Sequence, residues 1–176
     1  MNRTEKAESI FSRLAAANPS PQGELDHVNP YTLLVAVVLS AQATDKGVNR
    51  ATAGLFRKVK TPRQMLDLGE EGLIGHIKTI GLFRAKAKNV IQLSRDLIDR
   101  HDGEVPQSRE ELESLPGVGR KTANVVLNMA FGQPTMAVDT HVFRVSHRLG
   151  LAKGKTPLAV EEELLKVIPG KFMQHA

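Results

Sequence analysis

One stretch of the sequence, residues 115–139, gathers the side chains best suited to chemistry. They are two turn glycines, two cations and one carboxylate: Gly117, Gly119, Arg120, Lys121 and Asp139. A lysine amine that has lost its proton is a nucleophile, and a carboxylate stabilises positive charge that develops beside it. Lys121 and Asp139 are eighteen residues apart in the sequence. The stretch therefore contains both an attacking group and a stabilising charge.

The turn Gly117-Val118-Gly119 is predicted to bind phosphate through its backbone. Glycine adopts backbone angles closed to other residues and leaves the N–H groups of a turn unobstructed. A helix predicted from Arg120 follows at once, so its free amides and positive dipole end face whatever lies there. Such a grip reads no bases. The alternatives are an ordinary tight turn and, for Lys121, a second phosphate contact.

The composition fits a nucleic-acid partner and excludes several kinds of site. Among 176 residues the net charge is +5, which suits an anionic partner or simply a mildly basic protein. The absence of cysteine excludes disulfides, thiolate nucleophiles, zinc fingers and iron–sulfur ligation by this chain. The six histidines lack metal-ligand spacing, so we expect no metal site.

The sequence lacks the features of a membrane or secreted protein. Its longest apolar run, Tyr31–Leu39, is much shorter than the roughly 20 residues of a membrane span. The N-terminus carries acidic residues and has no apolar core, unlike a signal peptide. We therefore expect a cytoplasmic, nucleoid-associated protein that makes no membrane contact.

Hydrophobic spacing predicts an all-α fold. Ala7, Ile10, Phe11 and Leu14 follow the helical period, and the run after Pro30 is apolar on every side, as in a buried helix. Capping and proline signals divide the remainder. The predicted helices are 3–17, 30–39, one from Thr44 or Asp45, one from Thr61-Pro62, 70–77, 84–100, 108–114, 120–131, 140–149 and 157–168. No alternating strands are found.

A faint internal repeat links two turns. Residues 80–91 align with residues 115–126, and each segment is a turn that leads into a basic amphipathic helix. Chance similarity between helix starts explains the match about as well as duplication does.

The stretch 115–139 resembles the helix–hairpin–helix plus Gly/Pro–Asp signature of the endonuclease III family of DNA base-excision glycosylases. Leu39–Asp45, Ile80–Leu82 and Val138–Arg144 are also similar to that family, so the resemblance covers nearly the whole chain. It implies a two-lobed helical glycosylase that binds, as a monomer, double-stranded DNA with damaged pyrimidines or abasic sites. It also implies removal of oxidised pyrimidines followed by strand cleavage at the abasic site.

The resemblance assigns roles to individual residues. Lys121 matches the family's Schiff-base lysine and Asp139 its aspartate. The alternative for Asp139 is a helix N-cap, which is compatible with the family role because capping would also fix the position of the carboxylate. Adenine-excising relatives carry a small residue at the position that matches Lys121, so a lysine there favours lyase activity. Gln42 and Leu82 match the positions of the gap-filling and wedge side chains.

Each of the other DNA contacts has a plainer alternative. Gln42 could be a helix cap or surface residue, and Leu82 could pack a turn into the core. Arg84, Lys86 and Arg120 are candidate phosphate contacts or surface charges. His141 is similar to a family position, and no role is assigned to it.

The sequence departs from the family at its C-terminus. Family members carry a C-terminal loop whose four cysteines hold a [4Fe–4S] cluster, whereas this sequence reaches Ala176 with none. We expect a six-helix domain over 22–132 and an incomplete second domain over 1–21 with 133–176. No cofactor is expected within this chain; a cluster would require a continuation with four cysteines. The alternative functions are a helix–hairpin–helix DNA-binding module without catalysis and a structural helical protein.

Overall fold

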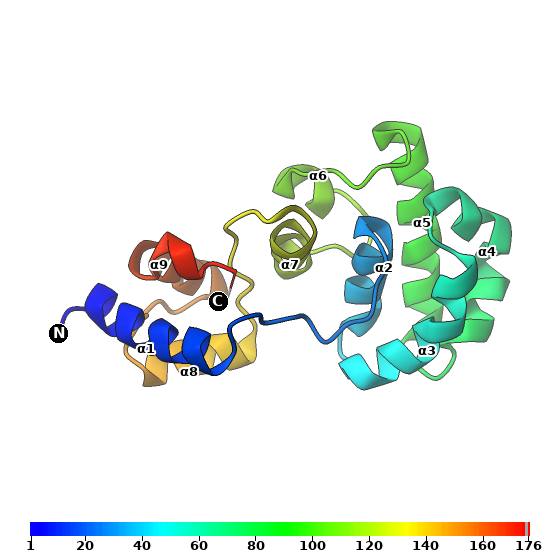
Figure 1. The fold of residues 1–176 in the computed structure, drawn as a ribbon. Coiled ribbons are helices and arrows are strands. Elements are labelled where there is room, and N and C mark those ends of the chain that lie inside the picture. Colours follow the sequence, from blue (N-terminus) through cyan, green and yellow to red (C-terminus); the bar gives the residue numbers. More distant parts are fainter. Residues whose placement is uncertain (175) are drawn as a thin grey trace. The chain divides into compact units, whose positions relative to one another are not determined.

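The computed structural model describes residues 1–174 and 176, and this part of the chain is all helical (Figure 1). It contains nine α-helices, one 3-10 helix and no strand, which confirms the predicted fold class. The helices are α1 (Arg3–Ala17), α2 (Pro30–Ser40), α3 (Asp45–Lys58), α4 (Pro62–Ile77), α5 (Phe83–His101), α6 (Arg109–Glu113), α7 (Arg120–Phe131), α8 (Thr140–Arg148) and α9 (Pro157–Val167), with the 3-10 helix η1 at Gly170–Phe172. None of the described helices is long and apolar enough to cross a membrane.

The chain forms two compact units. One is Gly23–Val126, and the other combines Met1–Gln22 with Leu127–Ala176. The chain passes from one unit to the other inside α7, whereas the predicted domain boundary lies after that helix, at residue 132. The domain division stays a prediction, because compactness alone does not test independent folding.

The unit Gly23–Val126 is built around α2. Every residue from Tyr31 to Leu39 is buried, as the all-round apolar pattern predicts. The helix starts at Pro30, and Asn29 closes a capping box with Thr32: the Asn29 side chain accepts from the Thr32 N–H at 2.8 Å, and the Thr32 hydroxyl accepts from the Asn29 N–H at 3.0 Å. Helices α3 and α5 pack against α2, and α4 lies along α5 (Figure 1).

Local signals in the sequence define where the helices begin. The side chains of Thr44, Thr61 and Thr156 cap α3, α4 and α9 by accepting from a backbone N–H three residues ahead. Within α4, Gly69 has φ +77°, which divides the element into two helical segments. This break corresponds to the two separate helices that the sequence predicts there.

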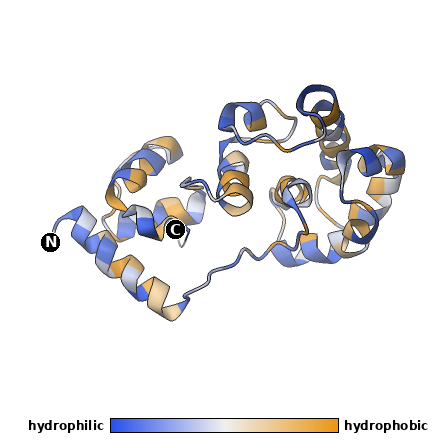
Figure 2. Cartoon of the chain, turned by 45° about the horizontal axis from the view of Figure 1, so that its top comes forward, coloured by the Kyte–Doolittle hydropathy of each residue, from blue (hydrophilic) through white to orange (hydrophobic). Residues whose placement is uncertain are grey.

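The other unit packs α1 and α8 against α9. Its core comprises Ala7, Phe11, Met136, Val138, Leu151, Ala152, Val160, Leu164, Val167, Ile168, Phe172 and Met173. Figure 2 shows hydrophilic and hydrophobic residues alternating along α1, which starts at the end marked N. Phe11 stacks on Phe172 with ring centroids 5.9 Å apart. The exposed side of α1 makes ion pairs that add little to stability, Arg3–Glu163 at 2.5 Å and Glu8–Lys171.

Candidate nucleic-acid interface and catalytic residues

The turn between α6 and α7 is held by buried apolar side chains. Leu112, Leu115 and Val118 are all buried. The Leu115 N–H donates to the Leu112 carbonyl at 3.0 Å, and the Val118 N–H donates to the Leu115 carbonyl at 3.2 Å. Gly117, between these anchors, and Gly119, directly after Val118, are exposed. The turn is therefore anchored in the core by these apolar side chains, while its glycine residues are exposed to solvent.

The two glycines of this turn serve different purposes. Gly117 has φ +77°, and a Cβ there would lie 3.0 Å from Asn89 Nδ2 and 3.2 Å from Asn89 Cβ. Only glycine satisfies both requirements without strain. Gly119 has no such left-handed angle, and a Cβ there would meet no described atom within 4 Å. Gly117 therefore uses a backbone angle that favours glycine, whereas Gly119 leaves the turn open without using such an angle.

Helix α7 places two cations at its positive end. Its first turn contains Arg120 and Lys121, and the Ala123 N–H donates to the Gly119 carbonyl at 2.9 Å. Lys121 is exposed and Arg120 is half-buried. Acidic side chains stabilise this end of a helix, whereas two cations destabilise it slightly. The same two cations favour the binding of an anion there.

Asp139 occupies the N-cap of α8. Its Oδ1 accepts a hydrogen bond from the Val142 N–H at 2.7 Å. The cap alternative for this residue is therefore observed. A capping bond also holds the carboxylate in one orientation, so it is compatible with a chemical role for the same side chain. The preceding residue Val138 is buried in the core and anchors the backbone there.

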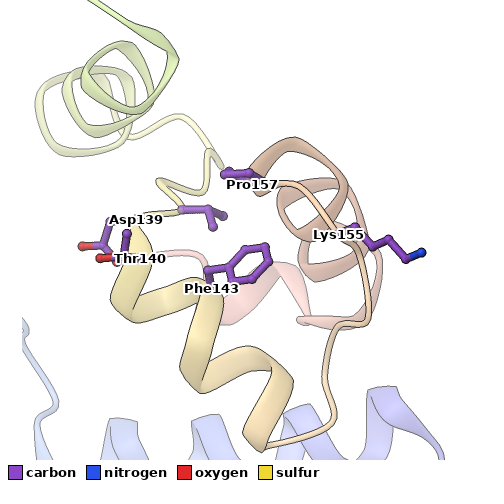
Figure 3. A pocket seen from close by; sticks show the side chains of 6 residues that line it. Asp139, Thr140, Phe143, Lys155 and Pro157 are labelled. Carbon is purple, nitrogen blue, oxygen red and sulfur yellow. The ribbon is translucent and has the colours of Figure 1, made fainter.

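An apolar hollow of about 510 Å³ lies beside Asp139. It is lined by Val138, Asp139, Thr140, Phe143, Lys155 and Pro157. In Figure 3 the Phe143 ring lies in this hollow, whereas the Asp139 carboxylate points away from the ring and Lys155 extends outward. The hollow is therefore mainly apolar, and the Asp139 carboxylate is directed away from the Phe143 ring.

Gln42 and Leu82 share an unusual backbone conformation. Gln42 has φ +54° and Leu82 has φ +59°, in the left-handed region that disfavours side chains with a Cβ. Both are exposed, and 64% of Leu82 is accessible to solvent. The core-packing alternative for Leu82 is therefore wrong. The cap alternative for Gln42 is also wrong, because Thr44 supplies the side-chain cap of α3, and α2 ends at Ser40 with Ala41 as its C-cap residue.

The cations of α5 differ from the expectation. Arg84 is exposed and lies over the Phe83 ring, 5.2 Å from its centroid. Lys86, a predicted candidate for a phosphate contact, is only 6% exposed, and its Nζ has no hydrogen-bond partner within the part of the chain that the structure describes. Burial lowers the pKa of the Lys86 ammonium. This structure places Lys86 inside the protein, so the surface-contact prediction is wrong for it.

One residue that contacts two backbone carbonyls was not predicted from the sequence. Asn128 lies on α7, and its side-chain amide donates to the carbonyls of Thr135 and Met173. An asparagine inside a helix, where this residue type is unfavourable, was the available signal, and it does not reveal which carbonyls would be contacted.

The sequence profile described as "HhH-GPD superfamily base excision DNA repair protein" matches residues 35–170. Endonuclease III of Haemophilus influenzae is 60% identical over 172 residues, which are 98% of this chain and 81% of the relative. Endonuclease III of Escherichia coli K12 is 56% identical over the same shares of the two chains. The chain therefore belongs to the endonuclease III family of base-excision DNA repair glycosylases.

Solved structures agree with this membership. A trapped covalent intermediate of endonuclease III with DNA has a TM-score of 0.90 and 47% identity, covering 99% of this chain and 83% of the other. A thermostable thymine-DNA glycosylase, 24% identical with a TM-score of 0.83 and covering 97% of this chain and 82% of the other, shares the fold.

The residues of this chain do not fit the family's iron–sulfur cluster. The sequence has no cysteine, and the described residues include no group of three or more histidine, aspartate or glutamate side chains that could hold a metal ion. The side chains of this chain therefore cannot ligate such a cluster through cysteine thiolates.

Proposed function

We propose that this chain is a bifunctional DNA glycosylase that removes oxidised pyrimidines from duplex DNA and then cleaves the strand at the resulting abasic site. The observation that carries the proposal is Lys121, an exposed amine in the first turn of α7 directly after a glycine turn. That turn would grip a DNA phosphate, so the amine would lie beside the sugar–phosphate backbone. All the proposed groups belong to one chain, so a monomer suffices.

In the proposed reaction Lys121 and Asp139 act on the sugar. As the bond from C1′ to the base breaks, the base leaves with the electron pair and the carboxylate of Asp139 stabilises the positive charge on the sugar. The deprotonated amine of Lys121 forms a bond to C1′, and opening of the sugar ring yields a Schiff base. Loss of a C2′ proton then expels the 3′ phosphate with the C3′–O electrons, and water later releases the lysine.

Gln42 and Leu82 are proposed to fill the space that the extruded base leaves. Both side chains project from exposed turns in a conformation that the fold alone does not favour. An apolar side chain can insert as a wedge between stacked bases, and a polar side chain can hydrogen-bond the base that has lost its partner. Arg84, two residues after Leu82, and Arg120, directly after Gly119, are proposed to contact DNA phosphates.

The first test is borohydride trapping on a duplex that contains an abasic site. The unchanged chain is expected to form a covalent adduct, and Lys121→Gln is expected to abolish it. Lys166→Gln, which removes an exposed lysine on α9, is the control and should leave the adduct yield unchanged. DNA binding without any adduct from the unchanged chain would contradict the proposal and favour the non-catalytic DNA-binding module.

The second test separates chemistry from capping at Asp139. Asn caps helices about as well as Asp, so Asp139→Asn should change the unfolding free energy by less than about 0.5 kcal/mol. Base excision is nevertheless expected to fall at least about 100-fold, because the negative charge is lost. If excision by Asp139→Asn stays within threefold of the unchanged chain, the carboxylate has no chemical role.

A further inference from the structure

Asn128 ties together three segments of the chain. Its Nδ2 donates to the Thr135 carbonyl at 3.1 Å and to the Met173 carbonyl at 3.2 Å. An amide nitrogen carries two hydrogens, so both are used. Met173 follows η1, and Thr135 lies in the segment that leads from α7 toward Asp139. One side chain on α7 therefore holds two segments that are 38 residues apart in the sequence.

The segment between α7 and α8 is constrained at both of its ends. At its start Gly132 has φ +64°, its N–H donates to the Asn128 carbonyl at 3.0 Å, and the Gln133 N–H donates to the Leu127 carbonyl at 3.0 Å, so a left-handed glycine closes the end of the helix. Near its end Met136 and Val138 are buried in the core. Between these constraints lies Thr135, whose carbonyl accepts from Asn128, four residues before Asp139.

We infer that Asn128 is a positioning residue for the Asp139 carboxylate, an inference that rests on the proposed function. Asn128 follows Lys121 by seven residues, which is two turns, so both lie on the same face of α7. Asparagine is a poor helix former, and alanine would suit the helix better. The amide is explained by the two carbonyls that it holds, and one of them belongs to the segment that sets the position of Asp139.

The structure supplies a matched control in the other unit. Asn49 also holds a loop through its amide: Nδ2 donates to the Glu24 carbonyl at 2.7 Å, and Oδ1 accepts from the Asp26 N–H at 2.8 Å. Replacing either asparagine by alanine removes two hydrogen bonds between a helix and a loop. Only the Asn128 change affects the segment that carries Asp139.

The experiment measures single-turnover base excision on a duplex with one oxidised pyrimidine, together with DNA affinity and melting temperature. Asn128→Ala is expected to lower the excision rate about 10- to 100-fold while the Kd for DNA changes less than threefold, because a small displacement of a reacting group slows chemistry more than binding. Asn128→Asp should lower the excision rate further, since its carboxylate would face two carbonyl oxygens and repel them. Asn49→Ala is expected to lower the melting temperature by a similar amount and keep the excision rate within threefold.

The outcomes separate this inference from the function on which it rests. If Asn128→Ala and Asn49→Ala reduce excision equally at matched melting temperatures, Asn128 is only structural and the inference is overturned. If Asn128→Ala weakens DNA binding as much as it slows excision, positioning of Asp139 is likewise overturned. Absence of excision and of adduct in the unchanged chain overturns the proposed function itself, and this inference with it.

Discussion

The turn before α5 and the turn before α7 each contain one residue in the left-handed conformation, but the two residues differ. The positions are Leu82 with φ +59° and Gly117 with φ +77°. Their entry hydrogen bonds also correspond, from the Ile80 N–H to Ile77 at 2.8 Å and from the Leu115 N–H to Leu112 at 3.0 Å. Glycine takes this conformation freely, whereas leucine costs roughly 1–2 kcal/mol. The fold therefore explains Gly117, and the exposed Leu82 needs a reason outside the fold.

The helices after these turns begin at different points, and this separates two lysines. Helix α5 starts directly after Leu82, whereas α7 starts three residues after Gly117. Lys86 and Lys121 are aligned in the sequence repeat, yet the two-residue difference rotates their side chains by about 200° relative to the helix start. Lys86 is consequently buried and Lys121 exposed. Sequence alignment of two turns does not guarantee equivalent side chains beyond them.

The largest effect on stability is expected for Gly117→Ala. The left-handed φ and the close approach of Asn89 should together destabilise the fold by about 2–3 kcal/mol, measured by urea unfolding. Gly119→Ala is the control, because its φ is not left-handed and its Cβ would enter open space. Asn89→Ala combined with Gly117→Ala should recover part of the loss. Equal destabilisation by the two glycine changes would break the distinction between Gly117 and Gly119.

A smaller effect of opposite sign is expected for Lys86→Met. A buried amine without a partner is replaced by an apolar chain of similar length, so the fold should gain about 1–2 kcal/mol at neutral pH. Lys88→Met, on the exposed side of α5, is the control and should change stability little. If Lys86→Met instead weakens DNA binding tenfold, the ammonium moves out to contact a phosphate and the contrast with Lys121 fails.

The gain from Lys86→Met should also depend on pH. Burial lowers the pKa of Lys86 in the folded chain below the ordinary value of 10.5, so the folded state releases this proton first as pH rises. Between the lowered pKa and 10.5 the unfolded chain binds more protons, and the unchanged protein gains stability with rising pH. The advantage of methionine is therefore full below the lowered pKa and shrinks across this interval. If the stability gain of Lys86→Met stays constant up to pH 11, the lowered pKa of Lys86 is contradicted.

The smallest effect on stability, and the most informative for function, is expected for Leu82→Gly. Relief of the left-handed strain should stabilise the fold by about 0.5–1 kcal/mol, while loss of the wedge lowers base excision. Asp102→Gly relieves a similar φ of +53° at the end of α5 and should leave excision unchanged. Excision by Leu82→Gly at the unchanged rate would remove the functional explanation for this leucine.

The sequence alone predicted features that depend on neighbours within a few residues. The cap of α3 at Thr44 or Asp45, the helix start at Thr61-Pro62, the proline start of α2 and its all-apolar run are local signals, because capping and helical spacing act within one or two turns. The family signature around Lys121 and Asp139 is also contiguous in the sequence.

Only the tertiary structure decided the features that depend on contacts between distant segments or on where a helix starts. The burial of Lys86 follows from the phase of α5, and the partners of Asn128 lie at Thr135 and Met173. The left-handed angle of Leu82 is equally invisible in a residue type that normally avoids it. A sequence states which groups are present, but the three-dimensional packing determines which side chains face solvent and which carbonyls they hold.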